Sequence, residues 1–161
     1  MLKFVKRRVV KPVMDLLRMG ATPGRLAWSL AAGVLIGINP VLGSTTVLAI
    51  AVASAFRLNY VASQVGNHVV YPLQLLLFPV WIKMGSALFG TPGLKLGRRE
   101  LLLAVKQHPW QTTRALWTWE WHALVVWAFA AAILMPLLAM ALKPLLQKML
   151  ERLHNEPVIE K

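Results

Sequence analysis

An uncharged stretch with a proline at its centre constrains the fold of this chain more than any other feature. Residues 26 to 56 contain no ionisable side chain, and Asn39 and Pro40 lie midway along them in GVLIGINPVLGSTTVLAIAV. One straight helix of this length would extend about 46 Å, but the hydrocarbon core of a bilayer is only about 30 Å thick. Two full spans need roughly 40 residues. A break near Pro40 resolves the mismatch, because proline lacks a backbone N–H and biases Asn39 away from helical geometry.

The break predicts a helical hairpin made of helices 24–38 and 42–56, joined by INPVLGS. Gly37 and Gly43 are expected to ease a tight turn between the two helices. Backbone exposed at a turn inside lipid must be satisfied by protein or trapped water. The side chains expected to supply those hydrogen bonds are Asn39, Ser44, Thr45 and Thr46. The pattern leaves open whether the hairpin enters the bilayer and returns or crosses it as two short, tilted spans.

The composition favours a membrane protein, since 57% of the residues are hydrophobic and 15% are charged. The net charge of +12 raises the alternative of nucleic-acid binding. The charges cluster beside the apolar stretches, however, which fits anionic phospholipid headgroups better, so no nucleic-acid partner is predicted. The chain has no cysteine, which excludes disulfides and thiolate chemistry.

A second stretch without formal charge covers residues 58–82. Its polar side chains recur at the spacing of one helical face. These side chains are Tyr60, Gln64, Asn67, His68 and Tyr71. Pro72 is predicted to end or kink this helix, and Pro79 adds a second disturbance. Length alone does not decide between one kinked span and a second hairpin.

The sequence divides into five expected segments. They are a basic amphipathic interfacial segment (1–20), a membrane domain with helical hairpins (21–90), a basic Trp-rich interfacial segment (91–120), a transmembrane helix (121–142) and a polar tail (143–161). For the first ten residues a solvated basic tail is an equal alternative, and no cleaved signal peptide is expected. Positive charge near the N-terminus and at 95–114 favours the cytoplasm for both. The side of the less basic tail stays open, although a final single crossing would place it outside.

Polar side chains inside the apolar stretches are the candidate functional residues, because such groups are costly in a bilayer. The candidate polar cavity consists of Asn39, Thr45, Gln64, Asn67 and His68. The alternative role for these groups is interhelical hydrogen bonding, worth about 0.6–2 kcal/mol per contact. A row of small residues at Ser29, Gly33 and Gly37 predicts close packing of another helix.

Arg25 and Arg57 flank the first uncharged stretch and are candidate contacts for an anionic group such as a phosphate. The alternative is ordinary snorkelling of a long cationic side chain to the membrane surface. No catalytic residues are predicted, because no carboxylate pair or nucleophile with an adjacent base is visible. The four histidines lack metal-ligand spacing, so neither a metal site nor a cofactor is expected.

The chain also resembles a known bacterial membrane-protein family over roughly residues 20–90. The similar features are P-x-x-G-x-T at Pro40, Gly43 and Thr45, the sequence RLN at 57–59, and YPLQ at 71–74 followed by Gly85. Together they resemble the domain of unknown function number two thousand and sixty-two. The resemblance implies a small integral protein of the bacterial inner membrane and carries no mechanism.

These observations predict an all-α integral protein of the bacterial inner (cytoplasmic) membrane with several passes. Its helices are expected to be short and broken, forming one or two hairpins, with Pro40 and Pro72 at the turns. The leading function is translocation or binding of a small or lipid-linked anionic molecule, without catalysis. The alternative is a structural or assembly role in the cell envelope, with small-residue and Trp-rich faces contacting a homo-oligomer or another envelope protein.

Overall fold

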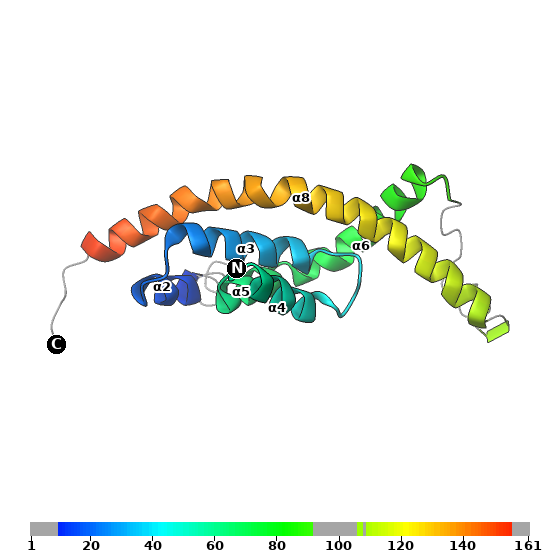
Figure 1. The fold of residues 1–161 in the computed structure, drawn as a ribbon, viewed down its shortest axis with the longest axis horizontal. Helices are drawn as coiled ribbons and strands as arrows, with labels where there is room; N and C mark the ends of the chain where they lie inside the picture. The colour runs from blue at the N-terminus through cyan, green and yellow to red at the C-terminus, as the bar shows by residue number, and fades with distance from the viewer. Residues whose placement is uncertain (1–9, 92–105, 108, 156–161) are drawn as a thin grey trace.

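The computed structural model describes residues 10–91, 106–107 and 109–155, and every regular element longer than one turn within them is an α-helix. The helices are α2 (Lys11–Arg18), α3 (Pro23–Gly37), α4 (Thr45–Ala55), α5 (Tyr60–Val69), α6 (Tyr71–Leu88) and α8 (Pro109–Asn155). Figure 1 shows α8 along one long side, with α3 beside it and with α2, α4 and α5 beyond α3. The expectation of an all-α fold is therefore confirmed for the described residues.

The central helix is α3, in which ten of fifteen residues are buried. It ends at Gly37, and α4 begins at Thr45, so the predicted break around Pro40 is present. The two helices pack against each other through Ala32, Ile36 and Ala49. The predicted helices 24–38 and 42–56 thus match α3 and α4 to within a few residues, because proline acts locally.

Small residues let α3 and α5 approach until their backbones touch. A Cβ atom on Gly33 would collide with the carbonyl oxygen of Ser63. A Cβ atom on Gly66 would lie 2.5 Å from the carbonyl oxygen of Leu30. The small-residue row predicted on α3 is therefore the surface that receives α5, within the same chain.

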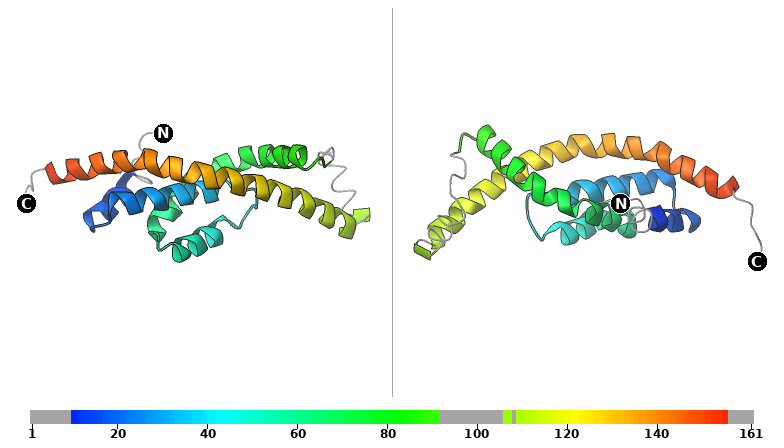
Figure 2. Two further views of the ribbon diagram at one scale, coloured as in Figure 1. Left: turned by 45° about the horizontal axis from the view of Figure 1, so that its top comes forward. Right: turned by 180° about the vertical axis from the view of Figure 1, so that it is seen from behind.

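Helices α5 and α6 form one bent pair, with an angle of 67° between them. The bend lies at Val70, and Pro72 stands in the first turn of α6 rather than at the end of α5. The first turn tolerates proline, because its missing N–H has no intrahelical acceptor there. The predicted end or kink at Pro72 is thus confirmed, with α5 ending at Val69 just before the proline and the chain bending there. Pro79 lies inside α6, which runs on past it to Leu88. Figure 2 shows from two further directions that α6 crosses α8.

The last helix, α8, has 47 residues and is about 70 Å long. It runs without interruption through parts of three predicted segments, the Trp-rich segment, the span 121–142 and the polar tail, and it contains Pro136 and Pro144. The remaining residues of those segments, 92–105, 108 and 156–161, lie outside the described chain, as do 1–9.

The N-terminal helix and the end of α8 lie at the same end of the molecule. Leu146 is buried in one cluster with Val13, Leu17 and Leu26. The sequence left the side of the tail open, with a final single crossing as one arrangement that would place it opposite the basic N-terminus. The packing of Leu146 on α2 does not fit that arrangement, because two segments in contact cannot be separated by a bilayer.

Large apolar side chains remain exposed along the molecule, among them Val47 at 72%, Phe129 at 69% and Ile133 at 64%. By length and composition, one helix in the described residues is long and apolar enough to cross a membrane, Trp110–Arg152 within α8. The bent pair α5–α6 passes the same test as a unit. At about 22 Å and 16 Å, α3 and α4 are each shorter than a hydrocarbon core.

Candidate functional site: an arginine pocket at the end of α4

Helix α4 ends in a Schellman motif that places an arginine in left-handed geometry. The N–H of Leu58 donates to the carbonyl of Ala53 at 2.8 Å, and the N–H of Arg57 donates to the carbonyl of Ser54 at 3.3 Å. Arg57 has a φ of 51°, which is the value that this motif requires and that glycine usually supplies. For other residues, the left-handed conformation costs roughly 1–2 kcal/mol.

Two other helices of the chain end in the same way, and both use glycine. Gly20 follows α2 with a φ of 87°, and Gly90 follows α6 with a φ of 63°. The corresponding N–H-to-carbonyl bonds are Ala21 to Leu16 at 3.1 Å and Thr91 to Ser86 at 3.0 Å. Arg57 therefore occupies a position that Gly20 and Gly90 fill at the other two helix ends with less backbone strain. What arginine adds at this position, compared with glycine, is its guanidinium side chain.

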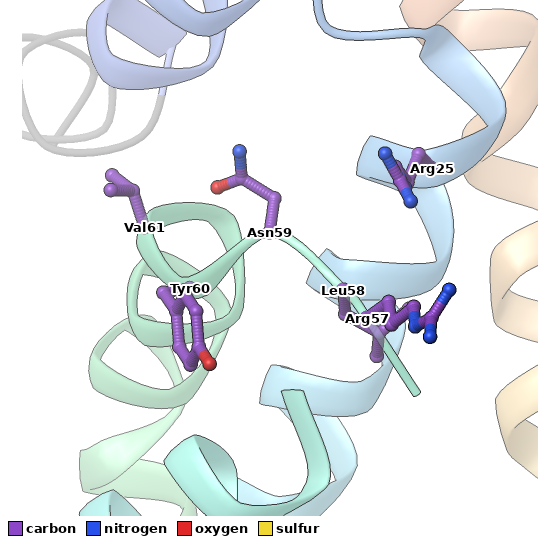
Figure 3. A pocket seen from close by; sticks show the side chains of 6 residues that line it. All are labelled: Arg25, Arg57, Leu58, Asn59, Tyr60 and Val61. Carbon is purple, nitrogen blue, oxygen red and sulfur yellow. The ribbon is translucent and has the colours of Figure 1, made fainter. Parts of the chain in front are cut away.

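Hydrogen bonds fix this turn to the beginning of α3. The hydroxyl of Ser29 donates to the carbonyl of Arg25 at 2.7 Å and accepts from the N–H of Asn59 at 2.8 Å. The side chain of Asn59 accepts from the N–H of Ala62 at 2.9 Å and so caps α5. Through Ser29, the turn that carries Arg57 is held against the turn of α3 that carries Arg25. Figure 3 shows Arg25 on α3 and Arg57 on the segment that leads into α5.

The two arginines line one pocket of about 250 Å³. The other lining residues are Leu58, Asn59, Tyr60 and Val61. Both arginine side chains are exposed, and within the described residues neither guanidinium has a hydrogen-bond or ion-pair partner. Helices α3 and α5 begin at this end and α4 ends there, so partial charges of both signs are present and the two guanidinium groups supply the net positive charge. The pocket is therefore electropositive and open to an anion.

At the other end of α3, three side chains from α6 and α8 donate hydrogen bonds to backbone carbonyls at the break between α3 and α4. The amide of Gln74 donates to the carbonyl of Asn39 at 3.0 Å. The indole N–H of Trp81 donates to the carbonyl of Ile38 at 2.8 Å. The indole of Trp127 donates to the carbonyl of Leu35 at 2.9 Å. The carbonyls that the break releases from the helix thus have donors within the protein.

Comparison with known proteins gives one match. Residues 6–156 match the family described as "Uncharacterized protein conserved in bacteria (DUF2062)". The chain belongs to this family. The match includes the Trp-rich segment and most of α8, well beyond the resemblance over 20–90. No curated protein and no solved structure matches the chain.

The five residues of the candidate polar cavity gather around the break. Asn39, Thr45 and Asn67 are buried, Gln64 is half-buried and His68 is exposed. The amide of Asn67 donates to the Gln64 side chain, and the amide of Gln64 donates to the carbonyl of Thr46, both at 3.4 Å. The ring Nδ1 of His68 lies 2.8 Å from the carbonyl of Gln64. These contacts are the interhelical and local hydrogen bonds that were the alternative to a cavity.

The sequence named Asn39, Ser44, Thr45 and Thr46 as partners for the backbone of the break, and of these Ser44 bonds to it directly. The amide of Asn39 reaches only the Ser44 hydroxyl, and its buried Oδ1 has no partner among the described residues. The hydroxyl of Ser44 donates to the carbonyl of Val41 at 2.9 Å and accepts from the amide of Asn39 at 3.4 Å. The sequence missed Gln74, Trp81 and Trp127, because nothing in an apolar helix marks which polar group turns inward. The available signal was Gln74, a single amide within the apolar run of α6, which could have been read as a buried hydrogen-bond donor.

The two glycines predicted to ease the turn have different roles. Gly43 has a φ of 85°, and a Cβ there would meet nothing, so its backbone conformation is what requires glycine. Gly37 is the last residue of α3, where a Cβ would lie 2.5 Å from a methyl of Val70 and 2.7 Å from the carbonyl of Asn67. Gly37 therefore serves close helix packing rather than the turn.

Proposed function

We propose that this chain is an integral protein of the bacterial inner membrane whose arginine pocket binds the phosphate of a lipid-linked anionic molecule. The observation that carries the proposal is that Arg25 and Arg57, which come from separate elements, line the same pocket. Neither guanidinium has a hydrogen-bond or ion-pair partner among the described residues. Guanidinium forks match phosphate oxygens bidentately, which makes arginine the preferred residue for such groups.

The membrane location is supported by the apolar side chains that the fold leaves exposed on α4, α6 and α8. A water-soluble monomer rarely exposes so much apolar surface. Within this proposal, α8 and the bent pair α5–α6 cross the bilayer. Helices α3 and α4 are too short to cross and form a re-entrant pair, with the break held by protein donors as membrane-buried backbone requires.

Binding at the headgroup level fits the surroundings of the pocket. Val61 lines it and is 53% exposed, and nearby Phe56 is 72% exposed. Apolar residues of this kind contact acyl chains while the arginines contact the phosphate. We favour binding over translocation, because Gln64, Asn67 and His68 make hydrogen bonds within α5 or to the backbone of Thr46. The side-chain oxygens of Asn39 and Asn67 are buried without a partner among the described residues.

An assembly role is the second candidate and is supported by the Trp-rich part of α8. Trp110, Trp117 and Trp121 are 79%, 69% and 55% exposed, and tryptophan is enriched at protein contacts and at membrane interfaces. The small-residue face named for partner contacts is covered by α5, so only the tryptophan face remains for this role.

The test is lipid binding by the protein purified in a neutral detergent, followed by native mass spectrometry. We expect the wild type to retain phosphatidylglycerol in preference to phosphatidylcholine, and the double variant R25Q/R57Q to lose at least tenfold in that affinity. R114Q, which changes an exposed arginine of α8 toward the other end of the molecule, is the matched control and should behave as the wild type. Equal retention of phosphatidylglycerol by R25Q/R57Q and R114Q would overturn the proposal.

A further inference from the structure

A second pocket lies at the opposite end of α3 from the arginines. It has a volume of about 380 Å³ and is formed where the break meets α6 and α8. Its lining residues are Val41, Leu42, Phe78, Leu116, Trp117 and Glu120. The glutamate is the one ionisable group in this lining, and every other side chain there is apolar or aromatic.

Glu120 is half-buried, and among the described residues it has neither a hydrogen-bond nor an ion-pair partner. A carboxylate in apolar surroundings is costly unless a cation pairs with it. Trp117 lies three residues earlier on the same face of α8, and an aromatic ring attracts a cation to its face.

We propose that this pocket binds the primary ammonium headgroup of an aminophospholipid, with the ammonium between Glu120 and Trp117. The apolar residues Leu42, Phe78 and Leu116 contact the adjoining hydrocarbon. The charge of the pocket selects a cation, just as the charge of the arginine pocket selects an anion. This inference does not rest on the arginine pocket, since the two sites share no residue.

The test uses lysophosphatidylethanolamine and its N-acetylated form, which keeps the phosphate and the chain but loses the positive charge. Binding to the full-length protein in neutral detergent is measured by native mass spectrometry. We expect the amine lipid to bind at least tenfold more tightly than the acetylated lipid, and E120Q to abolish that preference. E151Q removes an exposed carboxylate elsewhere on α8 and should keep the preference.

Two further measurements separate loss of the site from loss of the fold. E120Q should retain the helical circular dichroism of the wild type and its affinity for phosphatidylglycerol. W117L should reduce the preference for the amine lipid about threefold. Equal binding of the two lipids to the wild type, or an unchanged preference in E120Q, would overturn the proposal. Binding of dodecylammonium without binding of the amine lipid would overturn the lipid as the occupant.

Discussion

The polar groups at the two ends of α3 differ in whether the protein itself supplies their hydrogen-bond partners. At its C-terminal end, carbonyls released by the break accept hydrogen bonds from Gln74, Trp81 and Trp127. At its N-terminal end, Arg25 and Arg57 line a pocket and have no partner among the described residues. The contrast shows which polar groups the fold uses for itself and which it leaves available for a ligand.

The two ends also differ in charge. The basic residues that the structure describes near the arginine pocket, besides the two arginines themselves, are Lys11, Arg18, Lys143, Lys148 and Arg152. Those toward the other end are Lys83, Lys106 and Arg114. Positive charge favours the cytoplasmic side of a membrane protein. Within the proposed membrane location, we therefore expect the arginine pocket to face the cytoplasm. This orientation places Lys106 and Arg114 on the other side, although the sequence had favoured the cytoplasm for the 95–114 stretch as well.

The largest expected effect is an all-or-none difference in labelling between the two ends. The chain has no cysteine, so T22C and T118C each introduce a single reactive site on an exposed residue. An impermeant maleimide added to intact spheroplasts should label T118C and leave T22C unlabelled. Both variants should react after detergent is added. Equal labelling of the two variants from outside would contradict the assigned orientation.

Enlarging a glycine between α3 and α5 should cause the largest loss of stability. G33I would drive a branched side chain into the carbonyl of Ser63, so we expect a loss of at least about 3 kcal/mol and little protein in the membrane. G24A is the matched control, because a Cβ on Gly24 meets nothing and alanine favours the helix. Accumulation is measured by immunoblot of isolated membranes, and wild-type levels of G33I would refute the close contact.

Removing one hydrogen-bond donor from the C-terminal end of α3 should lower the stability less than G33I does. W81F keeps a ring but leaves the carbonyl of Ile38 without its hydrogen bond, which should lower the free energy of unfolding by about 1–3 kcal/mol. W110F changes an exposed tryptophan and serves as the control. Denaturant unfolding in detergent measures both. The affinity for phosphatidylglycerol should be unchanged in W81F, since that site lies at the other end.

The smallest expected effect is the most diagnostic, because stability and binding should change in opposite directions. R57G relieves the left-handed arginine and should raise the free energy of unfolding by about 0.5–1 kcal/mol, after allowance for the flexibility of glycine in the unfolded chain. The same change removes one guanidinium and should weaken phosphatidylglycerol binding. The converse variant G90R should lose stability without changing that binding. A parallel loss of stability and binding in R57G would show that Arg57 is structural.

Local features of the fold were predictable from sequence, and long-range contacts were not. Pro40 dictates a break because it lacks an N–H, and the small residues at Ser29, Gly33 and Gly37 dictate a close helix contact. The continuation of α8 beyond residue 142 was missed, because Lys143 and Pro144 resemble the start of a tail. That segment stays helical where Leu146 finds apolar partners on α2, a contact that no local pattern encodes.

The candidate site was predictable only in part. The positions of Arg25 and Arg57 beside an uncharged stretch made them candidate anion contacts, and the structure brings them into one pocket. The left-handed backbone of Arg57 was not foreseen, because a helix end without glycine carries no sequence signal for that geometry.

The donor from Trp127 reaches back 92 residues to Leu35. At a synthesis rate of about 5–20 residues per second, the ribosome needs roughly 5–20 s to supply this partner. During that interval the carbonyl of Leu35, in the last turn of α3, lacks its indole donor. The end of α3 must therefore stay in contact with water, the insertion machinery or the lipid surface until Trp127 has been synthesised.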